Sequence, residues 1–356
     1  MLRILAQRVV VRPCSPCRKF ATAPDNLELP PLAQWRTQFP FNTVVTRDAV
    51  TIKNADMADE IATAFLKATP GHSGEGKVVI EAFPVEPLPH FLKYLKPLEE
   101  LDSRVTVLPL SGHVWDTYSN IEERGLLQDV QSVPWESGTS DLQFIAQLPH
   151  TVSGEQLISQ LCRTVPERSW LFQYGRVPMS FITSQQIWNR LTSPMGSRLR
   201  CKLGVIAELS CEITAAVDSR RLGPWDDCFY PPARKSSKTM GKPMHAFTSI
   251  PYVDQIITPG AMEEWDYVLR RLFVTRNTLL KDALNSLAPG ASSLVSTLTD
   301  TMLPRHERVN VTKNISELNA SDWALILRAF HNWPFKPQLH LQYTHPELIH
   351  YYGWVI

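Results

Sequence analysis

The sequence lacks several features that would place it in a large class of proteins. No apolar run among its 356 residues approaches the roughly 18 residues that a membrane-spanning helix needs, so a soluble protein is expected. Internal repeats and low-complexity tracts are absent, and a formal net charge of +1 favours no particular partner. The length and a hydrophobic content of 44% are enough for one large domain and a smaller one.

Cysteine is sparse and scattered, which argues against zinc-binding motifs. Of the six cysteines, only Cys14 and Cys17 have the spacing of a ligand pair, and no second pair accompanies them. No metal site is therefore predicted. We expect the others to be reduced thiols, namely Cys162, Cys201, Cys211 and Cys228.

Acidic residues are absent from residues 1–20, and the first carboxylate in the chain is Asp25. The same stretch carries five basic residues, a pattern typical of a mitochondrial presequence. We predict a presequence over residues 1–23 and a location in the mitochondrial matrix; a disordered basic tail on a cytosolic protein is the alternative. Losing five charges changes the net charge from +1 to about −4 (1 − 5), so any nucleic-acid surface must be local.

The next part of the chain predicts a helix, a turn and a buried strand. Apolar residues recur at helical spacing over residues 47–67, and Pro70 and Gly71 end that pattern. Residues 77–82 are the best candidate for a buried strand. A helix, a turn and a strand ending in an acid are typical of the entry to a class I methyltransferase sheet. Further strands are predicted over residues 104–108, 141–146 and 201–209, and further helices over residues 181–191, 263–273 and 321–330.

A short loop directly follows the apolar run of residues 141–146. It consists of Gln147, Leu148, Pro149 and His150, and a helical pattern begins after it. In an open α/β sheet, the loops at the carboxyl ends of the strands hold ligands. An amide, a proline and a ring at this place predict that the loop binds a flat nucleobase. An ordinary helix entry for His150 is the structural alternative.

The tetrapeptide resembles the Asn-Leu-Pro-Tyr type loop of the rRNA adenine N6-dimethyltransferases, including the mitochondrial transcription factor B family and its fungal-type branch. The resemblance covers roughly residues 45–340 and implies a class I methyltransferase (Rossmann-like) α/β sheet over residues 24–255, with an N-terminal arm. It also implies a small helical nucleic-acid-binding domain with a tail over residues 256–356. The stretches that carry it include residues 85–98, 109–115, 169–179, 229–232 and 333–337.

The resemblance further implies that one βα unit is missing. In the family, the first strand ends in an acid and a second strand, after a glycine loop and a helix, ends in an acid that holds the ribose of S-adenosylmethionine. Glu81 and Glu86 are only five residues apart, whereas a crossover needs at least about 10–12 residues. Either this is a transcript or gene-model variant, or the lineage has lost the unit. Unpaired backbone groups beside a lost strand favour the first explanation.

S-adenosylmethionine is the cofactor that the resemblance implies, and an adenine of rRNA is the substrate. The loop Asn of the family accepts a hydrogen bond from the adenine amino group, and the loop aromatic stacks on the base. Gln147 carries the same amide on a longer stem, so whether the chain is an enzyme stays open. The catalytic positions are Gln147, Leu148, Pro149 and His150, and the cofactor positions are Glu81, Ala82, Glu86, Ser111, Gly112 and Gln147.

Basic residues are concentrated in the second half of the chain. Between Arg163 and Lys281 there are seventeen Lys and Arg residues against ten Asp and Glu residues. This local excess favours a nucleic-acid surface, although a solvated loop is an equally simple account of residues 234–239. The predicted contacts are Arg234, Lys235, Lys238, Arg270, Arg271, Arg276 and Lys281.

Three functions are compatible with these observations. The resemblance favours a mitochondrial transcription initiation factor that binds promoter DNA and assists a single-subunit mitochondrial RNA polymerase, acting as a monomer away from membranes. The first alternative is an S-adenosylmethionine-dependent dimethyltransferase of mitochondrial small-subunit rRNA. The second is a non-catalytic protein that binds RNA or assists ribosome assembly.

Overall fold

The described part of the chain leaves out both ends and several internal segments. The predicted presequence, the N-terminal arm before residue 50 and the basic loop of residues 234–239 lie outside it. The computed structural model describes residues 50–67, 77–82, 105–110, 127–128, 130–148, 150, 152–230, 232–233 and 240–339.

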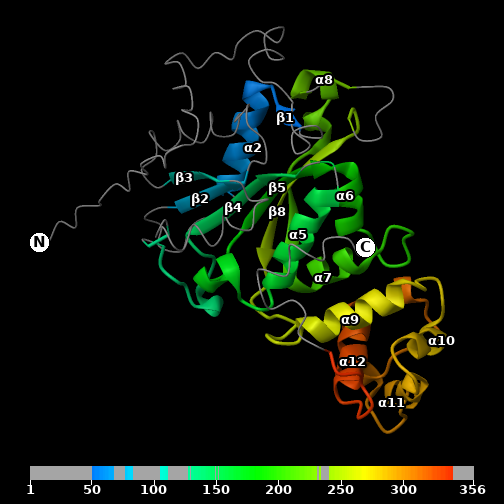
Figure 1. Cartoon of the computed structure of the whole chain (residues 1–356). Coiled ribbons are helices and arrows are strands. Elements are labelled where there is room, and N and C mark those ends of the chain that lie inside the picture. The colour runs from blue at the N-terminus through cyan, green and yellow to red at the C-terminus, as the bar shows by residue number, and fades with distance from the viewer. Residues whose placement is uncertain are drawn as a thin grey trace, which may run out of the picture.

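A six-stranded mixed sheet forms the centre of the described structure (Figure 1). In sheet order, its strands are β3 (Val105–Leu110), β2 (Lys77–Ala82), β4 (Leu142–Gln147), β5 (Met179–Ser184), β8 (Met244–Pro251) and β6 (Cys211–Val217). The first four are parallel, whereas β8 runs antiparallel to both of its neighbours. All residues of β4 and β5 are buried, as expected for parallel strands covered on both faces. The predicted methyltransferase-type sheet is confirmed.

The sheet contains no strand between β2 and β3. All six residues of β2 pair in register with β3, from Lys77 opposite Val105 to Ala82 opposite Leu110. In the usual doubly wound order, the second strand of the fold stands beside the first. Here the strand that follows residues 83–104 takes that place. Within the described ranges, the sheet therefore lacks one βα unit, as the spacing of Glu81 and Glu86 predicts.

Helices cover both faces of the sheet. Each strand presents side chains to both faces, because successive side chains of a strand point to opposite sides. The helices next to the sheet are α2 (Ala55–Lys67), α5 (Val152–Thr164), α6 (Gln185–Leu191) and α7 (Lys202–Ser210). Ile145 of β4 belongs to the buried cluster that includes α2. Its neighbour Phe144 belongs to the cluster that includes α5, α6 and α7. The two faces thus have separate cores.

The predicted strand over residues 201–209 is wrong. Those residues form α7 after a first residue, Cys201, and the strand begins only at Cys211. Most of α7 is buried, including residues on all sides of the helix, since it lies beneath the sheet and also packs on later helices. An apolar run of this kind shows no helical periodicity and is easily taken for a strand.

Two predicted helices begin later than expected. The predicted helix of residues 181–191 begins at Gln185, because the residues before it complete β5 and Ser184 accepts a hydrogen bond from the Ile187 amide. The helix predicted to begin at residue 47 begins at Ala55. Asn54 caps it by accepting a hydrogen bond from the amide of Met57 at 3.0 Å.

The described residues from 257 to 339 form mainly helices and turns, and their longer helices are α9 (Met262–Phe273), α10 (Leu280–Ala283), α11 (Leu294–Leu298) and α12 (Ala320–His331). They form the yellow to red part of Figure 1. Trp265 and Leu269 of α9 belong to the same buried cluster as Leu203 and Ile206 of α7. The apolar core is therefore continuous from the sheet into the C-terminal helices. Within the described ranges, every helix falls short of a membrane span in length or hydrophobicity.

A buried carboxylate joins α9 to the helices beneath the sheet. Asp266 of α9 lies 2.5 Å from Arg163 of α5 and 2.9 Å from Lys202 of α7. Burial raises the pKa of Asp266, but the two cations outweigh this effect and hold that pKa below its ordinary value. Glu167 fixes the start of the same helix by accepting hydrogen bonds from the amides of Gly260 and Met262.

Replacing Asp266 with Asn should lower the free energy of unfolding at pH 7 by about 1.5–3 kcal/mol, the range for a hydrogen bond to a charged group. Because the folded pKa is lowered, the contribution of Asp266 is complete above the ordinary pKa of 3.8 and disappears as the pH falls through the folded value. Urea titrations of both proteins from pH 7 to pH 2.5 will measure the difference.

The variant Asp254→Asn is the matched control. Asp254 is exposed, and no Lys or Arg among the described residues forms a salt bridge with it. This variant should differ little from the wild type at any pH. A loss from Asp266→Asn that stays constant down to pH 2.5 would contradict the assigned role of the charge.

Candidate functional site

The predicted catalytic loop lies at the carboxyl end of β4, as expected, but its side chains point inward. Gln147 is the last residue of β4 and is 3% exposed. Its side-chain amide donates a hydrogen bond to the main-chain carbonyl of Val50. If the Gln147 side chain were flipped, its own carbonyl oxygen would face the Val50 carbonyl and be repelled. The hydrogen bond therefore also fixes which way the amide points. The Gln147 Oε1 atom is buried and has no hydrogen-bond donor among the described residues.

The rest of the loop is packed in the same way. Leu148 is completely buried, and its amide donates to the carbonyl of Ile182 in β5 at 2.8 Å. His150 is 8% exposed, and its ring meets the Trp225 ring edge-on at 5.7 Å between centroids. Pro149 lies outside the described residues. Among the described residues of this loop, no ring therefore presents an exposed face on which a base would stack.

The predicted cofactor positions are only partly described. Glu81 and Ala82 end β2, next to Ile145 and Ala146 of the parallel strand β4, so their backbone lies at the same edge of the sheet as Gln147. Glu86, Ser111 and Gly112 lie outside the described residues.

Among the described residues, two features count against binding of S-adenosylmethionine at this edge of the sheet. The strand that would carry the ribose-binding acid beside β2 is replaced by β3, paired directly along its whole length. The amide of Gln147, the one cofactor position whose side chain is described, is already bonded to Val50.

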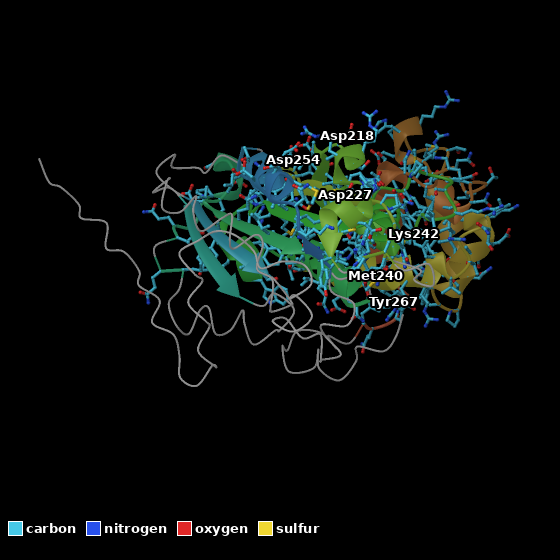
Figure 2. The ribbon with its side chains drawn as sticks, turned by 90° about the horizontal axis from the view of Figure 1, so that it is seen from above. Asp218, Asp227, Met240, Lys242, Asp254 and Tyr267 are labelled. Carbon is cyan, nitrogen blue, oxygen red and sulfur yellow. The ribbon has the colours of Figure 1, made fainter. Side chains whose placement is uncertain are left out.

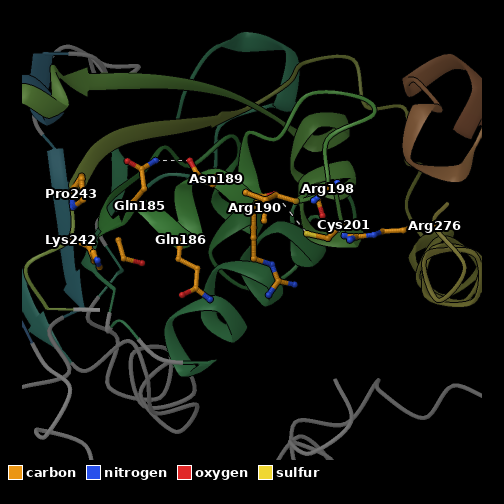
Figure 3. A pocket seen from close by; sticks show the side chains of 11 residues that line it. Gln185, Gln186, Asn189, Arg190, Arg198, Cys201, Lys242, Pro243 and Arg276 are labelled. Carbon is orange, nitrogen blue, oxygen red and sulfur yellow. Dashed lines mark hydrogen bonds between the residues drawn. The ribbon is translucent and has the colours of Figure 1, made fainter. Parts of the chain in front are cut away.

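An open cleft of about 560 Å³ lies at the carboxyl end of β5, next to the loop that follows α9 (Figure 3). It is rich in basic side chains, which come from three separate parts of the chain. Its lining residues are Ser184, Gln185, Gln186, Asn189, Arg190, Arg198, Leu199, Cys201, Lys242, Pro243 and Arg276.

The cations of this basic cleft differ in what holds them. Arg190 is 2.9 Å from Glu155 of α5, so its charge is partly compensated. Arg276 donates a hydrogen bond to the main-chain carbonyl of Arg198, which fixes its guanidinium at the rim. The side chains of Arg198 and Lys242 are exposed. Two exposed cations and one fixed guanidinium suit a ligand with several phosphates.

Aromatic packing forms one side of the same region. His245 stacks on Trp188 at 4.9 Å between centroids, and its Nε2 lies 2.9 Å from Oε1 of Gln185. Burial lowers the pKa of His245, so the ring is neutral at pH 7 and adds no charge to the cleft. The positive charge therefore comes from Arg and Lys alone.

Of the predicted nucleic-acid contacts, the structure brings Arg276 into the cleft. Arg270 and Arg271 are exposed at the end of α9, where Arg271 lies 5.5 Å from the centroid of the Tyr267 ring, and Lys281 is exposed on α10. These three do not line the cleft. The predicted contacts Arg234, Lys235 and Lys238 lie outside the described residues.

Sequence reasoning missed three cations of the cleft, namely Arg190, Arg198 and Lys242. Arg190 and Arg198 are eight residues apart, and Lys242 lies 44 residues further along the chain. The three form no motif, so the excess of basic residues after Arg163 was the available signal. In the view of Figure 2, Lys242 lies near the middle of the molecule, between Asp227 and Tyr267, and Asp218 and Asp254 lie nearer one edge.

Comparison with known proteins gives consistent matches. The mitochondrial transcription factor 1 of Saccharomyces cerevisiae is 26% identical over 256 residues, which are 68% of this chain and 70% of that protein. That of Lachancea kluyveri is 22% identical over 267 residues, or 72% of this chain and 75% of that protein. A dimethyladenosine transferase structure from Plasmodium falciparum has a TM-score of 0.47 at 16% identity and covers 79% of this chain and 97% of its own.

Residues 82–330 match the sequence model of a family described as ribosomal RNA adenine dimethylase. The match begins at the last residue of β2 and ends in α12, so it includes most of the sheet, the basic cleft and the C-terminal helices. Because it spans well over half of the sequence, the chain belongs to the ribosomal RNA adenine dimethylase family.

Proposed function

We propose that this chain is a mitochondrial transcription initiation factor that binds nucleic acid and assists a single-subunit mitochondrial RNA polymerase at promoters. The observation that carries the proposal is the extent of its similarity to proteins named mitochondrial transcription factor 1, which covers about two thirds or more of both sequences. The basic cleft supplies a surface for the nucleic acid.

The cleft would bind the phosphate backbone. Arg198 and Lys242 reach into solvent, and each phosphate that they neutralise releases a condensed counterion. Arg276 would act differently, because its bond to the Arg198 carbonyl orients the guanidinium before any ligand arrives. Arg270, Arg271 and Lys281 would extend this positive surface along the C-terminal helices. Arg234, Lys235 and Lys238 are proposed as further contacts to the nucleic acid.

The names of the relatives place them in mitochondria, and the acid-free N-terminal stretch of this chain supports the same location. We infer that residues 1–23 act as a transit peptide and that the protein works in the matrix as a monomer. The domain boundary near residue 256 is also part of this proposal, with a methyltransferase-type domain before it and a nucleic-acid-binding helical domain after it.

Methylation of rRNA is the alternative that family membership suggests. The closed loop at Gln147 and His150 and the directly paired strands β2 and β3 argue against it. Mass analysis of mitochondrial rRNA from a deletion strain distinguishes the transcription factor from the methyltransferase. Only the methyltransferase hypothesis requires that dimethyladenine is lost in that strain.

The purified mature chain should stimulate promoter-dependent transcription by its cognate mitochondrial polymerase. Transcription from a template without a promoter should not change, since the proposed role lies in initiation. Run-off assays with and without the chain will measure both. Absence of stimulation on the promoter template would leave an RNA-binding or ribosome-assembly role instead.

Arg198→Gln and Lys242→Gln should each weaken binding of promoter DNA. Each change removes about one phosphate contact, so the slope of log affinity against log salt should decrease by about 0.7–0.9. Fluorescence anisotropy at four salt concentrations will measure the slope. Arg305→Gln is the control, because Arg305 is exposed but does not line the cleft. An equal effect of all three changes would show that binding does not depend on the cleft.

A further inference from the structure

Two buried glutamines lie on the same face of β4. Gln143 and Gln147 are four residues apart, and because side chains of a strand alternate, both point towards the face that α2 covers. Gln143 is completely buried and Gln147 is 3% exposed. A buried amide is costly unless it is hydrogen-bonded, so the partners of these two side chains show what each residue does.

The two side chains bond to main-chain carbonyls at opposite ends of one segment. The amide of Gln147 donates to the carbonyl of Val50, five residues before α2 begins. The amide of Gln143 donates to the carbonyl of Phe65 in the last turn of α2 at 3.2 Å and to the hydroxyl of Ser180 at 2.9 Å. Together they fasten both ends of residues 50–67 to the middle of the sheet.

The residues just before α2 cross the end of the sheet as a short strap, which we define as Val50–Lys53. Its central residues form β1 (Thr51–Ile52), which pairs antiparallel with β7 (Phe229–Tyr230). The Lys53 amide donates to the carbonyl of Cys228 at 2.9 Å. Val50 is 6% exposed and Ile52 is completely buried. The strap is therefore an integral part of the packed structure.

We propose that Gln147 is a positioning residue that holds the strap, and that the strap closes the base position at the end of β4. The amide of Gln147 makes the same kind of contact as that of Gln143, a residue outside the loop. An Asn at position 147 would be shorter by one carbon, and its amide would fall short of Val50. The longer side chain thus suits the strap contact better than a contact to a base.

Hydrogen exchange of the Lys53 amide in the full chain tests the proposal, since that amide is bonded only while the strap is closed. Gln147→Asn should lower its protection factor at least tenfold, and Gln147→Glu should make protection depend on pH. A protonated Glu can donate to the Val50 carbonyl, whereas an ionised Glu cannot. Protection in this variant should therefore be near that of the wild type at low pH and fall at least tenfold once the carboxyl ionises.

Gln143→Glu is the matched control, because it places the same charge on the same face of β4. Gln143→Glu should lower the hydrogen-exchange protection of amides in the last turn of α2. The protection factor of the Lys53 amide should depend on pH as it does in the wild type. Equal pH dependence at Lys53 in both Glu variants would overturn the proposal, because the effect would then reflect global unfolding. Wild-type protection of Lys53 in Gln147→Asn would also overturn it.

A methylation assay tests closure of the base position. Neither the wild type nor Gln147→Asn should transfer a labelled methyl group from S-adenosylmethionine to an adenine-containing RNA hairpin. Transfer by the wild type would overturn the closure of this position. Both assays are independent of transcription, so the proposal can fail while the transcription role stands, and the reverse also holds.

Discussion

The ion pairs of Asp266 join the C-terminal helices to the helices beneath the sheet. One carboxylate contacts Arg163 from α5 and Lys202 from α7, and thereby holds α9 against both helices. The apolar core is continuous across the same junction. Arg276 follows α9 closely in sequence and donates to the carbonyl of Arg198, so the placement of α9 brings its guanidinium to the basic cleft. The composition of the cleft therefore depends in part on ion pairs that lie outside it.

Within the described ranges, the sheet shows no gap where the predicted βα unit would stand. An internal strand cannot simply be removed, because its neighbours would be left with unpaired backbone groups. In this chain the remaining strands close the gap, since β2 and β3 pair in register over all six residues. The described strands therefore carry no backbone cost of this kind.

Sequence reasoning succeeded where a local signal was strong. The strand at residues 77–82 has the predicted bounds, and α9 and α12 begin within one residue of the expected positions. It failed at α7, because a helix buried on all sides has no polar face and therefore no period. The start of α2 was also missed, because the pairing of β1 with β7 joins residues almost 180 positions apart and leaves no local trace.

The candidate sites were harder to predict, for a different reason. The position of Gln147 at the end of β4 follows from the local sequence, but the acceptor of its amide is Val50, which is almost 100 residues away. The same holds in the cleft, where Arg190, Arg198 and Lys242 meet only after folding. Sequence therefore located the edge of the sheet, whereas the role of each side chain depends on long-range contacts.

Family membership suggests two properties, a position that binds a base and a surface that binds nucleic acid. In this chain they depend on different contacts. The loop after β4 has kept its place in the fold, but its amide and its ring are used within the protein, against Val50 and Trp225. The exposed cations Arg198 and Lys242 line the cleft, together with Arg276 from the loop after α9. Under the roles proposed above, the chain closes the base position and keeps a surface for nucleic acid, because different contacts maintain the two sites.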